Sequence, residues 1–304
     1  MLSSALLALT AQQSFAGTYQ CSRWTQPERQ VQKPAQCDDT PGFGLLTPDI
    51  LARPELASLF QGMTEQDLIS NEHMRDKALQ AKFRTTSNMN AATFVFPSGV
   101  RRTVFRGSYQ APQFTPESVL VQHEGEQDRN RACMSELVGR QGLNKIVNYD
   151  ELDWPSAKTM TREERELLQS LNPAAQYWEF TPVYGRTFQY KFKNGRGATP
   201  AEKKRDVMGM VASIVREIEG DPSKPGSVYI HCYGGHHRTG VVWGVLQKCV
   251  GKMPVDDILN EYKCHIGYES PAQPGGYHAD NEALIREFPC EEFFPSNGGT
   301  PASK

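Results

Sequence analysis

The 304-residue sequence predicts an α/β fold, with a central, mostly parallel sheet flanked by helices and an N-terminal helical and loop-rich extension. Two observations predict it. From about residue 94 onward, apolar strand patterns alternate with helical patterns, which is the order that builds parallel sheets. In addition, a strand pattern at 227–231 leads through a glycine-containing loop directly into a helical pattern at 238–252.

The elements follow one another along the chain. Short apolar runs predict strands at 103–106, 145–149, 178–184 and 227–231. Helical spacing predicts helices at 131–140, 238–252, 255–263 and 279–287, and within the extension at 48–60 and 64–83. Two capping boxes of the Thr-x-x-Glu type, at 161–164 and 199–202, predict two further helix starts, and Pro200 at the first helical position supports the second.

The charge balance excludes several broad classes of protein. Lys and Arg number 33 and Asp and Glu 35, so the net charge is −2. A general nucleic-acid or acidic-membrane binder needs a basic surplus, which this sequence lacks. No apolar run reaches the roughly 18 residues that a membrane helix needs. We therefore expect no nucleic-acid partner and no integral membrane segment.

The first sixteen residues have the features of a secretory signal peptide. Residues 2–9 are mostly apolar, and Ser14-Phe15-Ala16 suits cleavage after Ala16. We expect a signal peptide at 1–16 and export to the periplasm or the exterior. Because the basic lead-in of such peptides is missing, a cytoplasmic chain with an ordinary first helix remains the alternative.

The seven cysteines are an odd number. If one stays reduced for chemistry, six remain to pair in an oxidising compartment. Cys21 with Cys37 and Cys264 with Cys290 are candidate bridges, and Cys249 is expected in the core or in a bridge. Connectivity cannot be deduced from sequence, and a cytoplasmic chain could carry seven thiols, so the cysteine count supports export only modestly.

The stretch 231–240 carries the chemistry, with the sequence His-Cys-Tyr-Gly-Gly-His-His-Arg-Thr-Gly. Five residues, none of them proline, separate Cys232 from Arg238, so every backbone N–H between them can turn inward around a small anion. The helix that follows points its positive end into the same space. Arg238 can bind two oxygens of a tetrahedral phosphate through its planar guanidinium.

The same positive field favours the thiolate form of Cys232. A thiolate at the floor of the loop can attack phosphorus in line, giving a phosphocysteine intermediate that water then hydrolyses. Thr239 is placed to hydrogen-bond the sulfur and ease its departure. Because Arg238 and the amides stabilise the equatorial oxygens, we expect no cofactor and no metal.

This segment resembles the signature loop of the cysteine-based protein tyrosine phosphatase superfamily: His-Cys, five residues, Arg, then Ser or Thr. Looser similarities to the atypical dual-specificity phosphatases lie at 104–108, 142–149, 235–240, 261–262 and 280–288. The resemblance implies a dual-specificity phosphatase-like catalytic domain at 98–290, an extension of unknown role at 17–97 and a disordered tail at 291–304.

The resemblance also implies roles for residues of the loop. Cys232 would be the nucleophile, Arg238 the phosphate clamp and His231 a buried group that tunes the thiolate. The implied reaction is the hydrolysis of phosphate monoesters, with a phosphorylated protein or a small phosphate ester as the substrate. The substrate-binding part of the loop comprises Tyr233, Gly234, Gly235, His236 and His237.

The proton donor remains open. Such enzymes need an acid, usually aspartate, to protonate the leaving oxygen. The window where the family carries it, 192–202, contains only Glu202, which the capping box explains better. Asp150 and Asp153 follow a predicted strand whose carboxyl end faces the ligand crevice. We take Asp150 as the expected acid, with Asp153, Glu202 and Asp280 as alternatives.

Other functions stay open beside this one. A catalytically weak pseudophosphatase that only binds phosphate would keep the loop and lack the acid. An inositol phosphate or phosphoinositide phosphatase is another alternative, although His236 stands where the related atypical group has lysine and reduces the positive charge at neutral pH. A rhodanese-type sulfur transferase is disfavoured by the Arg-Thr-Gly ending.

Overall fold

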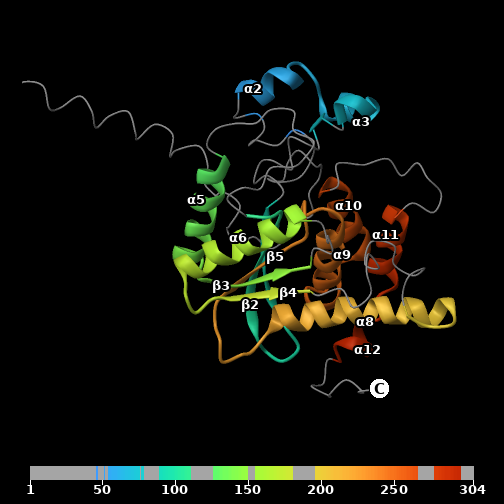
Figure 1. The fold of residues 1–304 in the computed structure, drawn as a ribbon. Coiled ribbons are helices and arrows are strands. Elements are labelled where there is room, and N and C mark those ends of the chain that lie inside the picture. The colour runs from blue at the N-terminus through green and yellow to red at the C-terminus, as the bar shows by residue number, and fades with distance from the viewer. Residues whose placement is uncertain are drawn as a thin grey trace, which may run out of the picture.

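In the computed structural model, the chain forms a five-stranded sheet with helices on both faces (Figure 1). The structure describes residues 54–75, 77–78, 89–110, 126–149, 155–180, 196–265 and 277–295, together with Leu46 and Leu51. No helix within these ranges is long and apolar enough to cross a membrane. The predicted signal segment at 1–16, the candidate Cys21–Cys37 bridge and most of the predicted extension lie outside the described residues.

The sheet confirms the predicted fold class. Its strands are β1 (Asn90–Val95), β2 (Arg101–Gly107), β3 (Leu143–Asn148), β4 (Gln176–Glu179) and β5 (Ser227–His231). They lie in the order β1-β2-β5-β3-β4, with β1 antiparallel to β2 and the other pairs parallel. The strand predicted at 227–231 is therefore the central one, and its carboxyl end lies between the ends of β2 and β3.

Most of the predicted helices are also present. The helical elements are α2 (Pro54–Ala57), η3 (Ser58–Phe60), α3 (Glu65–Ser70), α5 (Glu126–Gly139), α6 (Pro155–Leu171), α8 (Pro200–Glu219), α9 (His237–Val245), η6 (Leu246–Val250), α10 (Val255–His265), α11 (Tyr277–Glu287) and α12 (Cys290–Phe293). The helix predicted at 238–252 is α9 continued by a π-helical turn, η6. The one predicted from 64 to 83 is interrupted after Ser70, because Asn71 adopts an extended backbone.

The core has two layers, one on each face of the sheet, because successive strand residues point to opposite faces. Val104, Val147 and Ile230 belong to the layer shared with α8 and α9. Their chain neighbours Phe105, Ile146 and Tyr229 belong to the layer shared with α5 and α6. Apolar burial on both faces keeps the parallel strands dry and holds the carboxyl end of β5 in a fixed place.

One of the two predicted capping boxes is correct. At the start of α8, Thr199 Oγ1 accepts from Glu202 N at 3.2 Å and the Glu202 carboxylate accepts from Thr199 N at 2.8 Å. The box at 161–164 is wrong, because α6 begins earlier, at Pro155. Thr161 and Glu164 instead turn inward and make buried hydrogen bonds. Residues three apart lie on the same face of a helix, so a Thr-x-x-Glu sequence can form either an N-terminal cap or a buried polar pair within the helix.

The folded domain extends beyond both of its predicted boundaries. Strand β1 ends at Val95, before the predicted start at 98, yet it is part of the sheet. At the other end, Phe294 is 6% exposed and packs into the core, so the predicted tail from 291 begins too early. The predicted strand at 178–184 begins sooner, at Gln176, and its part beyond Phe180 lies outside the described residues.

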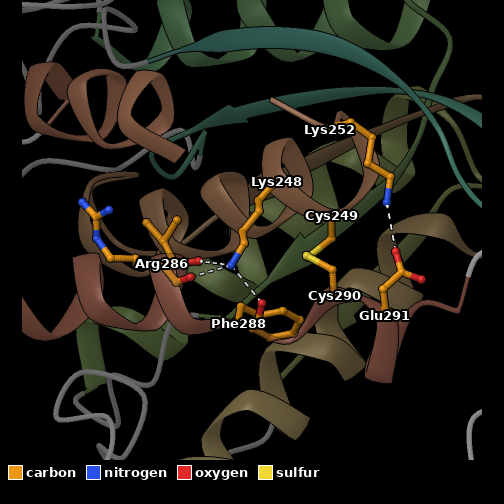
Figure 2. Close-up of a disulfide and its surroundings, with 8 residues drawn as sticks. Lys248, Cys249, Lys252, Arg286, Phe288, Cys290 and Glu291 are labelled. Carbon is orange, nitrogen blue, oxygen red and sulfur yellow. Dashed lines mark hydrogen bonds and ion pairs between the residues drawn. A yellow bond between two sulfur atoms is a disulfide. The ribbon is translucent and has the colours of Figure 1, made fainter. Parts of the chain in front are cut away.

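A disulfide joins Cys249 of η6 to Cys290 of α12, with the Cα atoms 5.1 Å apart (Figure 2). The candidate Cys264–Cys290 bridge is therefore wrong. Next to the disulfide, Lys248 Nζ donates to the carbonyl oxygens of Arg286 at 2.6 Å and Phe288 at 2.9 Å (Figure 2). The ammonium group thus caps the carboxyl end of α11, close to the disulfide.

Candidate functional site

The 231–240 loop leaves the sheet at the carboxyl end of its central strand. His231 ends β5, and the pairing register puts it beside Gly107 of β2 and Asn148 of β3. The loop is short, because α9 already begins at His237. The predicted strand, loop and helix are thus confirmed, at the edge where parallel α/β sheets bind ligands.

The thiol of Cys232 is held by the hydroxyl of Thr239. Cys232 is a free cysteine and only 3% exposed. Its backbone N–H donates to Thr239 Oγ1 at 2.9 Å, and that hydroxyl donates to Cys232 Sγ at 3.1 Å. The expected hydrogen bond between Thr239 and the sulfur is present, and it connects the beginning of the loop to the first turn of α9.

Two carbonyl groups of the loop point backward, toward the end of β2. Tyr233 O accepts from Tyr109 N at 3.3 Å, and Gly235 O accepts from Arg106 Nη2 at 2.6 Å. No described peptide bond is cis. In a trans peptide the C=O and the following N–H point in opposite directions. The amide after each of these carbonyls therefore points away from β2, as an anion-binding loop requires.

Gly235 lets the loop approach β2 this closely. Its φ is +69°, in the left-handed region. A Cβ atom at this position would lie 2.2 Å from Gly107 O and 2.3 Å from Gly107 C. Any side chain would both strain the backbone and push the loop off the strand.

Arg238 lies in the first turn of α9 and is only 4% exposed. Its Nη1 donates to the backbone oxygen of Tyr149 at 3.3 Å, so β3 helps to hold the guanidinium. His236 occupies the N-cap position but makes no side-chain cap, which leaves the positive end of α9 to face the loop. The remaining predicted substrate-binding residues differ in exposure: Gly234, Gly235 and His236 are buried, whereas Tyr233 and His237 are half-buried.

Two buried residues beside the loop were not assigned a role from the sequence. The hydroxyl of Tyr149 is fully enclosed, and burial and the nearby Cys232 raise its pKa. Burial lowers the pKa of Arg106 to about 10, opposed by the charge of Glu261, so the guanidinium stays protonated at neutral pH. Both residues lie at the carboxyl ends of predicted strands, and this position could have identified them from the sequence as residues near the ligand crevice.

His231 is fully buried behind the loop. Its Nδ1 lies 3.2 Å from Cys232 O, and its Nε2 lies 2.8 Å from Glu164 Oε2. The carboxylate oxygen is not aligned with the ring N–H direction, so we describe this contact as an ion pair. Glu164 is a third residue that the sequence did not place at the site, because it was assigned to a helix cap.

Of the two acid candidates that the structure describes, Glu202 is engaged in the cap of α8. The Glu202 carboxylate accepts hydrogen bonds from the backbone of Thr199 and Ala198, and those bonds lower its pKa. A lowered pKa is the wrong direction for a general acid at neutral pH. Asp280 lies in the first turn of α11. Asp150 and Asp153 lie outside the described residues.

Within the described part of the chain, no three His, Cys, Asp or Glu side chains gather as metal ligands would. No protein-family model and no curated protein matches the sequence. Solved structures of similar shape include the core catalytic domain of the PP-IP phosphatase SIW14 from S. cerevisiae in complex with citrate, at 17% identity and a TM-score of 0.35. That alignment covers 62% of this chain and 83% of the other. A second structure of the Siw14 catalytic core aligns at 16% identity, with a TM-score of 0.35, over 62% of this chain and 82% of its own.

Proposed function

We propose that this protein is a metal-independent phosphatase of the tyrosine or dual-specificity type, which hydrolyses phosphate monoesters through a phosphocysteine intermediate. One observation carries the proposal: the free thiol of Cys232 receives a hydrogen bond from Thr239 at the start of α9, in a loop that also contains Arg238. Backward-pointing carbonyls and a helix N-terminus give this loop the positive character that a phosphate dianion needs.

The reaction has two steps. In the first, the Cys232 thiolate attacks phosphorus, an S–P bond forms, and the P–O bond to the leaving group breaks as an acid supplies its proton. In the second, water attacks the phosphocysteine and gives a proton back to the deprotonated acid, the S–P bond breaks, and inorganic phosphate leaves. Arg238 and the loop amides stabilise the equatorial oxygens in both steps. The Thr239 hydroxyl donates a hydrogen bond to the departing sulfur and keeps its proton.

We propose Asp150 as the acid of the first step. It directly follows Tyr149, whose carbonyl oxygen accepts a hydrogen bond from Arg238. The residue before Asp150 in the sequence therefore contacts the guanidinium that would bind the phosphate, which supports Asp150 as the acid. A pH–rate profile of Asp150→Asn, compared with Asp153→Asn and Asp280→Asn, tests the assignment. The rate of an enzyme that needs a protonated acid falls at high pH. If only one variant loses this fall from its pH–rate profile, the substituted residue is the proton donor.

Cys232→Ser provides the main test of the proposed reaction. The variant should lose hydrolysis of p-nitrophenyl phosphate completely and still bind vanadate or inorganic phosphate, because the loop and Arg238 remain. Residual turnover in Cys232→Ser, or activity that a metal chelator removes, would contradict the proposal. Retained phosphopeptide binding without turnover of any aryl phosphate would instead identify a pseudophosphatase.

The substrate class is testable with one panel. Purified protein should be offered a phosphotyrosine peptide, a phosphoserine peptide, a phosphoinositide, an inositol polyphosphate and pyrophosphate. We expect a phosphomonoester with a good leaving group, such as an aryl phosphate, to turn over fastest, because it depends least on the acid. A clear preference for the inositol polyphosphate would favour the alternative of an inositol phosphate phosphatase.

We further propose that the protein works in an oxidising compartment, after export. The Cys249–Cys290 bridge and the disulfide-bonded state of Cys133 support this, because disulfides are rare in reducing compartments. Alkylation and mass spectrometry of the protein from its native source should find Cys249 and Cys290 protected and Cys232 labelled. Complete labelling of Cys249 and Cys290 under native conditions would indicate a cytoplasmic protein.

A further inference from the structure

Glu164 is a buried carboxylate that the proposed reaction does not use. It lies on α6 and its side chain is 0% exposed. A carboxyl group is almost never enclosed in this way unless charge partners or hydrogen-bond donors compensate it. The donors around Glu164 therefore define its charge.

Two donors approach the Glu164 carboxylate. The backbone N–H of Gln110 donates to Oε1 at 2.6 Å. The hydroxyl of Tyr177 donates to Oε2 at 2.7 Å, and its direction is fixed because Asn148 Nδ2 already donates to that hydroxyl at 3.1 Å. Hydrogen bonds donated to both oxygens favour the ionised carboxylate.

The two ring nitrogens of His231 both lie close to oxygen atoms, although the Glu164 oxygen is off the ring N–H direction. Nε2 lies 2.8 Å from Glu164 Oε2, and Nδ1 lies 3.2 Å from the backbone oxygen of Cys232. A carbonyl cannot donate a proton, so Nδ1 carries one, and the carboxylate 2.8 Å away favours a second proton on Nε2. The rings of Tyr109 and Tyr229 pack on the imidazole at centroid distances of 4.6 and 5.6 Å and keep the pair from solvent.

We propose that Glu164 is a positioning residue that keeps His231 as an imidazolium, whose Nδ1–H holds the Cys232 carbonyl and places a positive charge next to the thiolate. The proposal rests on the proposed function only for its consequence, the reactivity of Cys232. The ion pair connects α6 to the end of β5, so the reactive loop depends on a helix that the signature motif does not include.

The other titratable groups that face this pair do not compete for the proton. Tyr177 on β4 and Tyr229 on β5 stay neutral, since burial and the charge of Glu164 raise their pKa well above the ordinary value. Tyr109, after β2, exchanges a hydrogen bond with Thr161 of α6 at 2.8 Å. Among the described residues, Glu164 is the acid within ion-pair distance of His231.

The protonation state of His231 is measurable directly. Protein labelled with ¹⁵N-histidine should show both ring nitrogens of His231 protonated from pH 5.5 to 8.5, with the signal assigned by its loss in His231→Asn. In Glu164→Gln one ring nitrogen should lose its proton within that pH range. Glu166→Gln is the matched control, because Glu166 lies on the same helix with a side chain 67% exposed.

A second readout measures the consequence at the sulfur. The rate at which iodoacetamide alkylates Cys232 should show its midpoint at higher pH in Glu164→Gln, by about one unit, so that alkylation at a pH well below the wild-type midpoint slows about tenfold. Glu166→Gln should alkylate like the wild type. Neither measurement needs turnover, so an inactive protein would refute the proposed function and leave this inference intact.

Two results would overturn the inference. One is a neutral His231 ring in the wild-type protein at pH 7.5, which includes the case of a protonated Glu164 that donates to Nε2. The other is a His231 ring that stays protonated, with unchanged Cys232 alkylation, in a folded Glu164→Gln variant. If Glu164→Gln fails to fold, the wild-type spectrum alone decides.

Discussion

The hydroxyl of Thr239 accepts a hydrogen bond from the backbone N–H of Cys232 and donates one to the sulfur of the same residue. One side chain therefore fixes both the position of the cysteine backbone and the environment of its thiol. Because these bonds span the whole loop, Thr239 connects the nucleophile to the helix dipole of α9.

Thr239→Val should slow turnover of p-nitrophenyl phosphate by about 10²-fold, the typical cost of removing one preorganised donor. The slower step should be hydrolysis of the phosphocysteine, since the departing sulfur loses its hydrogen bond. Rapid-mixing kinetics should therefore show a burst of p-nitrophenol in the variant. Thr239→Ser keeps the hydroxyl and should stay near wild type; equal losses in both variants would contradict this role.

Gly235→Ala should destabilise the fold and abolish activity. The substitution forces a Cβ atom onto Gly107 and adds roughly 1–2 kcal/mol of left-handed backbone strain. Gly209→Ala is the control, because it lies within α8 with nothing within 4 Å of the added Cβ. It should raise the free energy of unfolding by about 0.5–1 kcal/mol. Urea unfolding measures both, and a fully active Gly235→Ala variant would refute the close approach.

Arg106→Met should cost about 1–3 kcal/mol of stability, because the buried Gly235 O loses its donor and the buried Glu261 loses a nearby positive charge. Burial raises the pKa of Glu261, so the folded state holds its proton more tightly than the unfolded chain does. The stability of Arg106→Met should therefore fall as the pH rises above the unfolded value of about 4.5.

The double variant Arg106→Met/Glu261→Gln should regain part of that stability but little activity, since Gly235 O still lacks its donor. Urea unfolding at pH 5 and pH 8, together with kcat/KM, separates the two effects. Full recovery of kcat/KM in the double variant would show that Arg106 does not orient the loop.

Glu202→Ala should lower the melting temperature at pH 7 and leave kcat nearly unchanged. The capping bonds lower the pKa of Glu202, so its stabilising effect is present above the unfolded value of 4.5 and is lost as the pH falls through the folded value. The difference in melting temperature from wild type should therefore shrink progressively as the pH falls below 4.5. A fall in kcat of about 10²-fold or more would instead identify Glu202 as the general acid.

The sequence was sufficient to predict the parts of the fold that depend on local patterns. The β5 strand at 227–231 and the capped start of α8 are present where the periodicity and the Thr-Pro-x-Glu signal placed them. The β1 strand was missed, because its pairing with β2 is a contact between chain segments rather than a local pattern.

The residues that hold the reactive loop in place could not be predicted either, because they come from distant segments of the chain. Glu164 has the spacing of a helix cap, and only the packing of α6 against the sheet turns it toward His231. The pairing of Cys290 with Cys249 likewise depends on how α12 folds back onto η6. The signature loop identifies the reactive residues, whereas their neighbours come from tertiary structure.

The central place of β5 in the sheet has a practical consequence. The cysteine loop takes its restraints from Arg106 on one neighbouring strand and from Tyr149, just past the end of the other. An isolated peptide carrying residues 227–252 would contain every letter of the motif and none of these restraints. Grafting such a segment into an unrelated scaffold should transfer the sequence motif without the reactivity of the cysteine.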